Sequence, residues 1–136
     1  MNFTKTTAYS FLVLSHLAKH DNEILSASVL FRQLGIPYSY LRTILLDLSK
    51  QGLIRGTKGR NGGFILARAG SDIYLSEIIN TTEGPDNLNS CIMGFETCPF
   101  DKGCFLHPVW TRMRSEINEL LTKTSLTDLL NILDKS

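Results

Sequence analysis

The sequence lacks any apolar run close to the roughly 20 residues that a membrane-spanning helix needs, and residues 1–23 lack the small-residue cleavage site of a signal peptide. We therefore expect no membrane partner and a cytoplasmic location, where thiols stay reduced. Cysteine is scarce too: the three cysteines all fall within residues 91–104. A disulfide framework would be even-numbered and spread out, so this cluster indicates metal ligation or thiol chemistry.

Net charge is also nearly absent, but it is unevenly distributed. The whole chain of 136 residues carries +1. Residues 32–68 carry +6 and the remainder carries −5, because a lone aspartate opposes seven cations in that segment: Arg32, Arg42, Lys50, Arg55, Lys58, Arg60 and Arg68. Such asymmetry is typical of a polyanion-binding region, although charge alone is equally consistent with a solvated basic face.

Apolar spacing predicts three helices in the first half of the chain. Residues 4–19 form the first, with a buried face made of Ala8, Phe11, Leu12, Leu14, Leu17 and Ala18. Ser26 caps a second, short helix that runs to Leu34 and turns inward Val29, Leu30 and Phe31. After a turn at residues 35–38, a third helix runs to residue 51, ends at Gly52, and buries Leu41, Ile44, Leu45 and Leu48.

Two short apolar strands, 53–57 and 64–68, flank a Gly/Asn-rich tip and predict a β-hairpin. A short helix over residues 76–82 follows, and residues 83–104 show no periodicity. A long helix then begins near Pro108, and Ser125 caps a last one. The expected fold class is mainly α with a small β-hairpin wing, a winged helix-turn-helix followed by a long C-terminal helix.

This arrangement of helices and wing suits duplex DNA, since a helix fits the major groove and a basic hairpin can neutralise phosphates. We expect the third helix to read bases with four residues near its N-terminus: Ser39, Tyr40, Arg42 and Thr43. The wing contributes Lys58, Arg60 and Asn61. Three alternatives stay open: Ser39 as a helix cap, Tyr40 packed against the second helix, and Arg42 as a solvated charge. No Ser/His/Asp or paired-carboxylate pattern suggests an enzyme.

The cysteines form the pattern Cys91-x6-Cys98-x5-Cys104-x2-His107. Thiolates suit zinc or iron–sulfur iron, and a nitrogen ligand is compatible with either. Unliganded or redox-active thiols are the remaining possibility. His107 directly precedes Pro108, so it also fits a residue that caps the long helix. Two functional alternatives therefore stay open beside a cluster sensor: a zinc-stabilised DNA-binding protein and a small iron–sulfur redox protein.

Two segments carry a resemblance to a known family. The third helix and its exit read Ser39-Tyr40-Leu41-x-x-Ile44-Leu45-x-x-Leu48-x-x-x-Gly52-Leu53-Ile54, and the wing reads Lys58-Gly59-x-x-Gly62-Gly63-Phe64-x-Leu66-Ala67-Arg68. These motifs resemble the Rrf2 family of bacterial winged-helix transcription regulators, which includes the iron–sulfur regulator IscR and the nitric-oxide sensor NsrR. The resemblance extends over nearly the whole chain.

The resemblance implies a DNA-binding domain at residues 1–70, and a cluster-binding loop with dimerisation helices at residues 71–136. It implies a homodimer on a palindromic operator, with the long helices crossed through residues at nearly heptad spacing: Trp110, Met113, Ile117, Leu120 and Leu121. It also implies an iron–sulfur cluster, 2Fe–2S rather than 4Fe–4S, held by Cys91, Cys98, Cys104 and His107. Operator binding would then respond to redox state, nitric oxide or cluster status.

The chain departs from its relatives at three points. Arg42 stands where IscR-like proteins have a glutamate that helps to select operators, and arginine favours guanine O6/N7, so a different base preference is expected. Ala8 stands where 4Fe–4S relatives recruit a carboxylate, and it cannot act as a ligand. The spacing from Cys91 to Cys98 is one residue longer than in IscR.

Overall fold

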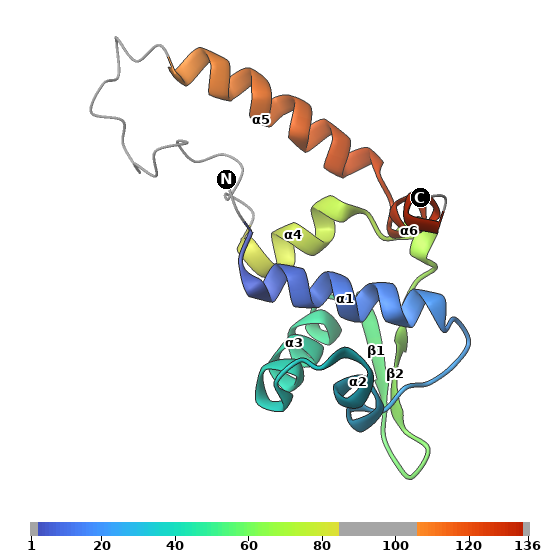
Figure 1. Cartoon of the computed structure of the whole chain (residues 1–136). Coiled ribbons are helices and arrows are strands. Elements are labelled where there is room, and N and C mark those ends of the chain that lie inside the picture. Colours follow the sequence, from blue (N-terminus) through green and yellow to red (C-terminus); the bar gives the residue numbers. More distant parts are fainter. Residues whose placement is uncertain (1–2, 85–105, 135–136) are drawn as a thin grey trace.

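A computed structural model describes residues 3–84 and 106–134. Helices dominate it, and one two-stranded antiparallel sheet forms the wing (Figure 1). In chain order the elements are α1 (Lys5–Lys19), α2 (Ala27–Leu34), α3 (Tyr38–Lys50), β1 (Ile54–Thr57), β2 (Gly63–Leu66), the 3-10 turn η1 (Gly70–Asp72), α4 (Leu75–Glu83), α5 (Leu106–Lys123) and α6 (Leu126–Asp134). The predicted fold class is confirmed.

Short side chains determine where the first two helices begin. The Thr4 hydroxyl accepts a hydrogen bond from the Thr7 N–H at the start of α1, and the Ser26 hydroxyl accepts one from the Val29 N–H at the start of α2. Both side chains satisfy N–H groups that lack a partner inside the helix. Gly35 then ends α2 at φ +70°, a left-handed conformation that glycine adopts without strain.

The turn after Gly35 leads directly into α3. Pro37 occupies the N-cap position and makes no side-chain cap hydrogen bond, so Ser39 lies inside the helix and does not cap it. The predicted apolar stripe of α3 is confirmed, with each member at most 2% exposed: Leu41, Ile44, Leu45 and Leu48. The stripe fixes which face of α3 points outward.

The hairpin is joined to the loop before α2. Strands β1 and β2 pair in register from Ile54 opposite Leu66 to Thr57 opposite Gly63. Leu25 forms an isolated bridge with Phe64: the Phe64 N–H donates to the Leu25 carbonyl at 2.8 Å, and the Leu25 N–H donates to the Phe64 carbonyl at 3.0 Å. The part of the hairpin next to its tip is therefore hydrogen-bonded to the segment that enters α2.

One hydrophobic core contains residues from both sides of position 70. Leu14 and Leu17 of α1 share it with Ile73, Ile78 and Leu126, each at most 1% exposed. The start of α6 is also bonded to the segment before α4, because the Leu126 N–H donates to the Ile73 carbonyl at 2.8 Å. Helices α4 and α6 thus cover α1 on the side away from α3, as Figure 1 shows.

Three predictions about inward-facing residues are wrong. Leu12 is 47% exposed and Ala8 is exposed, because α1 buries Thr7, Ser10 and Val13 in their place. Phe31 is 40% exposed and packs edge-on against Tyr38, with ring centroids 5.6 Å apart. In α1 the buried face includes two hydroxyl side chains, which an apolar pattern cannot reveal.

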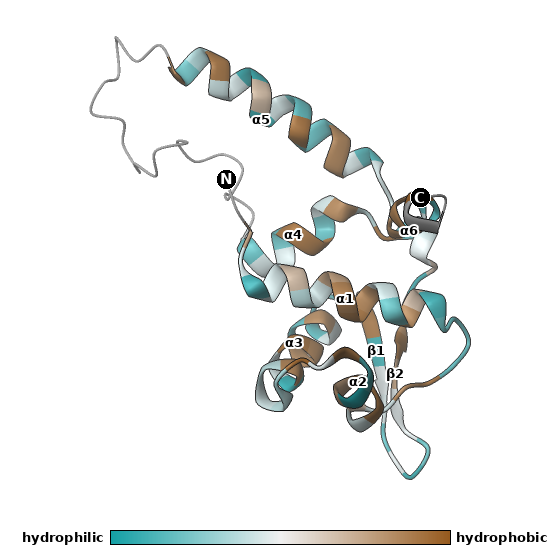
Figure 2. Cartoon of the chain, in the orientation of Figure 1, coloured by the Kyte–Doolittle hydropathy of each residue, from teal (hydrophilic) through white to brown (hydrophobic). Residues whose placement is uncertain are grey.

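Helix α5 differs from the others because most of its residues are not packed against the rest of the chain. It spans 18 residues, of which Trp110 alone is buried. Apolar residues alternate with polar ones along its exposed length (Figure 2). Within residues 3–84 and 106–134, no helix is both long and apolar enough to cross a membrane.

Candidate DNA-binding surface and metal-ligating residues

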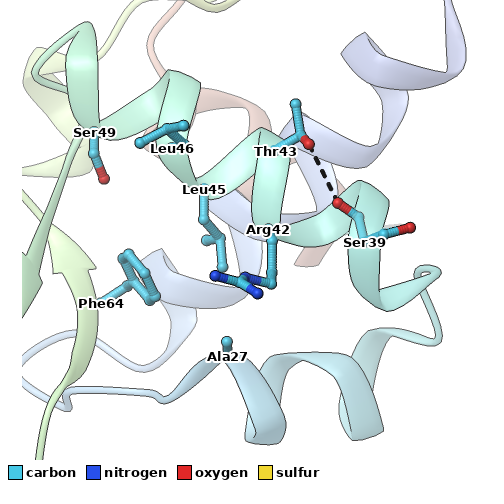
Figure 3. Close-up of a pocket in the computed structure, with 8 residues that line it drawn as sticks. All are labelled: Ala27, Ser39, Arg42, Thr43, Leu45, Leu46, Ser49 and Phe64. Atoms are coloured by element: carbon cyan, nitrogen blue, oxygen red, sulfur yellow. Dashed lines mark hydrogen bonds between the residues drawn. The ribbon is translucent and has the colours of Figure 1, made fainter.

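The outward face of α3 forms one side of an open groove. Ser39, Arg42, Thr43, Leu46 and Ser49 recur at helical spacing along this face. The groove measures about 530 Å³, and its floor and opposite side come from Leu45, from Ala27 at the start of α2, and from Phe64 of β2 (Figure 3). Helix α3, the start of α2 and strand β2 of the wing therefore meet along a single concave surface.

Three of the four predicted base-reading residues lie in this groove. Ser39, Arg42 and Thr43 are exposed, and the Thr43 hydroxyl donates to the Ser39 carbonyl at 3.2 Å. Arg42 extends from α3 toward Ala27 (Figure 3). Arg42 is absent from the ion pairs formed among the described residues. A guanidinium in this position is available for an acceptor outside the chain.

Tyr40 has a different environment from the other three. Its ring packs edge-on against Tyr9 of α1, with centroids 5.3 Å apart, and its hydroxyl is hydrogen-bonded to the Thr6 hydroxyl. Tyr40 does pack inside the chain, as one alternative held, but its partner is α1 and not the second helix. Tyr40 is 36% exposed, so part of the side chain still faces solvent.

The wing presents its predicted polar residues at the tip. Lys58, Arg60 and Asn61 are all exposed between the two strands. The tip is a tight turn in which Gly59 has φ +108° and its carbonyl accepts from the Gly62 N–H at 3.0 Å. A basic, narrow hairpin of this kind can reach phosphates or the minor groove.

Arg68, one of the seven cations of residues 32–68, is paired within the chain. Its guanidinium is paired with the Glu77 carboxylate at 3.0 Å and donates to the Asp72 carbonyl at 3.0 Å. Glu77 in turn accepts from the Tyr74 N–H at the start of α4. Arg68 thus joins the end of the hairpin to α4, and the excess positive charge available to a partner is smaller than the sequence indicated.

The predicted cluster ligands fall mostly outside the described residues. Cys91, Cys98 and Cys104 lie in residues 85–105. His107 is the second residue of α5 and its side chain is exposed, so it is part of the helix and does not precede it as a cap. Within the described ranges no group of three His, Cys, Asp or Glu side chains is placed to hold a metal ion.

The residues predicted for dimerisation differ in how far they are exposed, and they form three groups. Met113 and Leu120 are 47% and 65% exposed. Ile117 and Leu121 are half-buried, and Leu121 packs against the core of its own chain. Trp110 is 6% exposed, so little of its surface is available to a second molecule.

Sequence reasoning missed a polar cluster where α1 begins and α4 ends. The Glu83 carboxylate accepts from the Thr4 N–H at 2.6 Å and from the Thr7 hydroxyl at 2.7 Å, and Thr7 also bonds Thr82 at 2.6 Å. Burial alone would raise the pKa of Glu83, but these hydrogen bonds outweigh it and the pKa is lowered. The partners are more than 70 residues apart, so no local signal could have found them.

Comparisons with known proteins agree with this architecture. The family model for Rrf2, described as an iron-dependent transcriptional regulator, matches residues 3–132. The regulator NsrR of Bacillus licheniformis is 31% identical over 132 residues, covering 96% of this chain and 92% of the relative. IscR of Photorhabdus laumondii is 29% identical over 133 residues, covering 96% of this chain and 80% of the relative.

A solved structure gives the same fold. CymR, the global cysteine regulator of B. subtilis, superposes with a TM-score of 0.80 at 24% identity and covers 97% of this chain and 98% of its own. The protein is therefore a DNA-binding transcription regulator of the winged-helix class and not an enzyme. More specifically, the chain belongs to the Rrf2 family.

Proposed function

We propose that the protein binds a palindromic operator as a homodimer, with α3 of each subunit in the major groove. The observation that carries this proposal is the groove on the outward face of α3, where the exposed Arg42, which forms no ion pair with the described residues, lies beside exposed hydroxyl side chains. Ser39 and Thr43 supply the hydroxyls, and Tyr40 adds a partly exposed ring at the edge. On the wing, Lys58, Arg60 and Asn61 contact the backbone or the minor groove.

The second subunit is expected on α5. Met113 and Leu120 expose large apolar side chains on this helix, and Ile117 and Leu121 are partly exposed. Such residues gain stability when a second copy covers them. Trp110, being nearly buried, supports the shape of this region more than it contacts the partner. Two reading heads on one symmetric dimer match a palindromic site.

We further propose that Cys91, Cys98, Cys104 and His107 hold an iron–sulfur cluster, with 2Fe–2S favoured over 4Fe–4S. The donor set fits: three thiolates and one imidazole suit cluster iron, and the His107 side chain is exposed at the start of α5. A cluster bound there would supply redox-active iron. Family membership alone does not decide the signal, since the similar CymR is described as a cysteine regulator.

The chain itself connects the ligand position with the dimer surface. His107 and Leu120 belong to one helix of 18 residues, so a constraint on His107 acts on the element proposed to contact the second subunit. We expect operator affinity to depend on redox state, nitric oxide or cluster status through this connection. Zinc in place of iron, with no sensing role, is the alternative that metal analysis tests.

The DNA part of the proposal is tested with an operator selected from random duplexes by the wild-type protein. We expect Arg42→Ala to weaken binding about 10- to 100-fold, because one good contact between arginine and guanine contributes about 1–3 kcal/mol. Lys19→Ala is the control: it removes a positive charge from the exposed end of α1, away from the groove. If both variants lose the same amount of operator affinity, Arg42 contributes only non-specific positive charge.

The metal part of the proposal is tested on protein purified without oxygen. We expect iron and sulfide in the wild type, a brown colour, and their loss in Cys98→Ala. His107→Ala is expected to retain a less stable cluster, because it removes the weaker imidazole ligand and leaves all three thiolates in place. Colourless wild-type protein with stoichiometric zinc would overturn the cluster. Equal operator affinity of apo, reduced, oxidised and NO-treated protein would overturn the sensing role.

A further inference from the structure

One side chain in the α3 groove does not match the polar residues around it. Leu46 is 55% exposed and lies between Thr43 and Ser49 on the groove face (Figure 3). The neighbouring Leu45 is 2% exposed and forms part of the floor of the groove (Figure 3). The fold therefore uses Leu45 for its core and leaves Leu46 in the surface that faces a partner.

The far side of the groove is also apolar. Ala27 and the partly buried ring of Phe64 lie across from α3, and together with Leu45 they make the floor on which an apolar group is sheltered from water. Single exposed leucines are ordinary on protein surfaces. Leu46 differs because it occupies the recognition face itself, one helical turn after Arg42.

Base edges in the major groove of DNA are almost entirely hydrogen-bonding groups. The exception is the C5-methyl group of thymine, which apolar side chains contact. Arg42 and Thr43 can form hydrogen bonds with the base edges. Leu46 can form none, so opposite a polar base edge it would leave the donors and acceptors of the base without a partner. The positive charge of Arg42 beside the groove fits a polyanion and not an apolar peptide or small molecule.

We propose that Leu46 is a specificity-determining residue that contacts the methyl group of a thymine in each half-site of the operator. This inference rests on the proposed DNA binding through α3. Leu46 follows Arg42 by four residues, about 6 Å along the helix, and successive base pairs are about 3.4 Å apart. The thymine therefore lies within about two base pairs of the one that Arg42 contacts.

The test replaces thymines of the selected operator, one symmetric pair at a time, by deoxyuridine, which lacks the methyl group and keeps the same pairing. We expect one replacement to weaken wild-type binding about three- to fivefold per half-site, as expected for loss of one buried methyl group. Leu46→Ala is expected to weaken binding to the thymine operator and to lose this sensitivity. Leu46→Met, which keeps an apolar side chain, is expected to retain it.

Leu12→Ala is the matched control, because Leu12 is 47% exposed on α1 and lies outside the groove. It should keep both affinity and deoxyuridine sensitivity. If Leu46→Ala shows the wild-type sensitivity at every thymine, or if the wild type shows none, the Leu46 contact is wrong while DNA binding stands. If the wild type selects no operator at all, the proposed function itself has failed.

Discussion

Helices α3 and α5 both carry a row of apolar residues, but the two rows have different surroundings. In α3, four such residues are each at most 2% exposed and face α1 and α2 of the same chain. In α5, which is longer by five residues, Trp110 is buried and the others leave much of their surface uncovered. Met113 and Leu120 are the clearest examples.

The difference indicates what each helix needs in order to be stable. The position of α3 is determined by contacts inside one chain, so its outward face is presented to a partner without rearrangement. Uncovered leucine and methionine on α5 would gain from burial by about 1.5–3 kcal/mol per fully covered side chain. An element with this much uncovered apolar surface is consistent with the proposed contact between two subunits.

The largest expected effect on stability comes from replacing one leucine by alanine in the apolar row of α3, compared with the same replacement in the row of α5. Leu48→Ala should lower the free energy of unfolding by about 3 kcal/mol at every protein concentration, because it leaves a cavity in a closed core. Leu120→Ala should change the stability of the single chain by less than about 0.5 kcal/mol. Its effect should fall on the dimer, whose dissociation constant is expected to rise about tenfold, or about 1.4 kcal/mol.

Denaturation at several protein concentrations and sedimentation velocity separate these effects, because the stability of a dimer depends on concentration and that of a core does not. If the dissociation constant of the dimer is unchanged in Leu120→Ala, the proposed dimer contact at this part of α5 is wrong. A concentration-dependent effect of Leu48→Ala would mean that the α3 row is not closed within one chain.

A smaller effect is expected where the wing approaches the loop before α2. A side-chain carbon added at Gly63 would lie 2.5 Å from the Leu25 carbonyl oxygen, so Gly63→Ala forces the two backbone segments apart. We expect a loss of about 2 kcal/mol in the free energy of unfolding, measured by urea denaturation. Arg60→Ala at the exposed tip is the control, and a similar loss there would show that the close approach is not the cause.

The smallest effect is expected where Glu83, at the end of α4, accepts hydrogen bonds from the start of α1. Replacing Glu83 by glutamine should destabilise the protein by about 1 kcal/mol near neutral pH, since a hydrogen-bonded carboxylate is lost at a partly exposed site. Hydrogen bonds lower the pKa of Glu83 in the folded protein. Its contribution is therefore complete above the ordinary pKa of glutamate and is lost as the pH falls through the lowered value.

The difference in stability between wild type and Glu83→Gln should accordingly stay constant from neutral pH down to the ordinary pKa of glutamate and narrow as the pH falls further, in thermal unfolding measured at each pH. Glu119→Gln is the control, because Glu119 forms an exposed pair with Lys123 on α5. A gap that stays constant with pH would mean that the charge of Glu83 contributes nothing.

The sequence predicted those parts of the fold whose signal is local. The stripe of α3 and the caps at Ser26 and Ser125 follow from short-range spacing, and the structure confirms them. The buried face of α1 was mispredicted because Thr7 belongs to a polar cluster with α4, which an apolar count ignores. Distant contacts of this kind depend on the tertiary structure and have no signature in a short window.

The candidate site shows the same division. Exposed polar residues of α3 and the wing were predicted from their position in the helix-turn-helix pattern, and the structure places three of them, Ser39, Arg42 and Thr43, in one groove. Their contacts with DNA stay predictions. The apolar lining from Ala27 and Phe64 was not predicted, because it arises from the approach of the wing to α2. The ligand role of the three cysteines lies outside the described residues and also stays a prediction.

The core shared across residue 70 has a consequence for how a signal can alter DNA recognition. Leu17 packs in the same interior as Ile73 and Leu126, so α3, α1 and α4 share one hydrophobic core. If α5 forms the proposed dimer contact, we expect a change there to displace each DNA-binding surface as a unit and to leave the side chains on that surface as they are. We expect such a signal to change which spacings between the two half-sites are bound. The base sequence preferred within each half-site should stay the same.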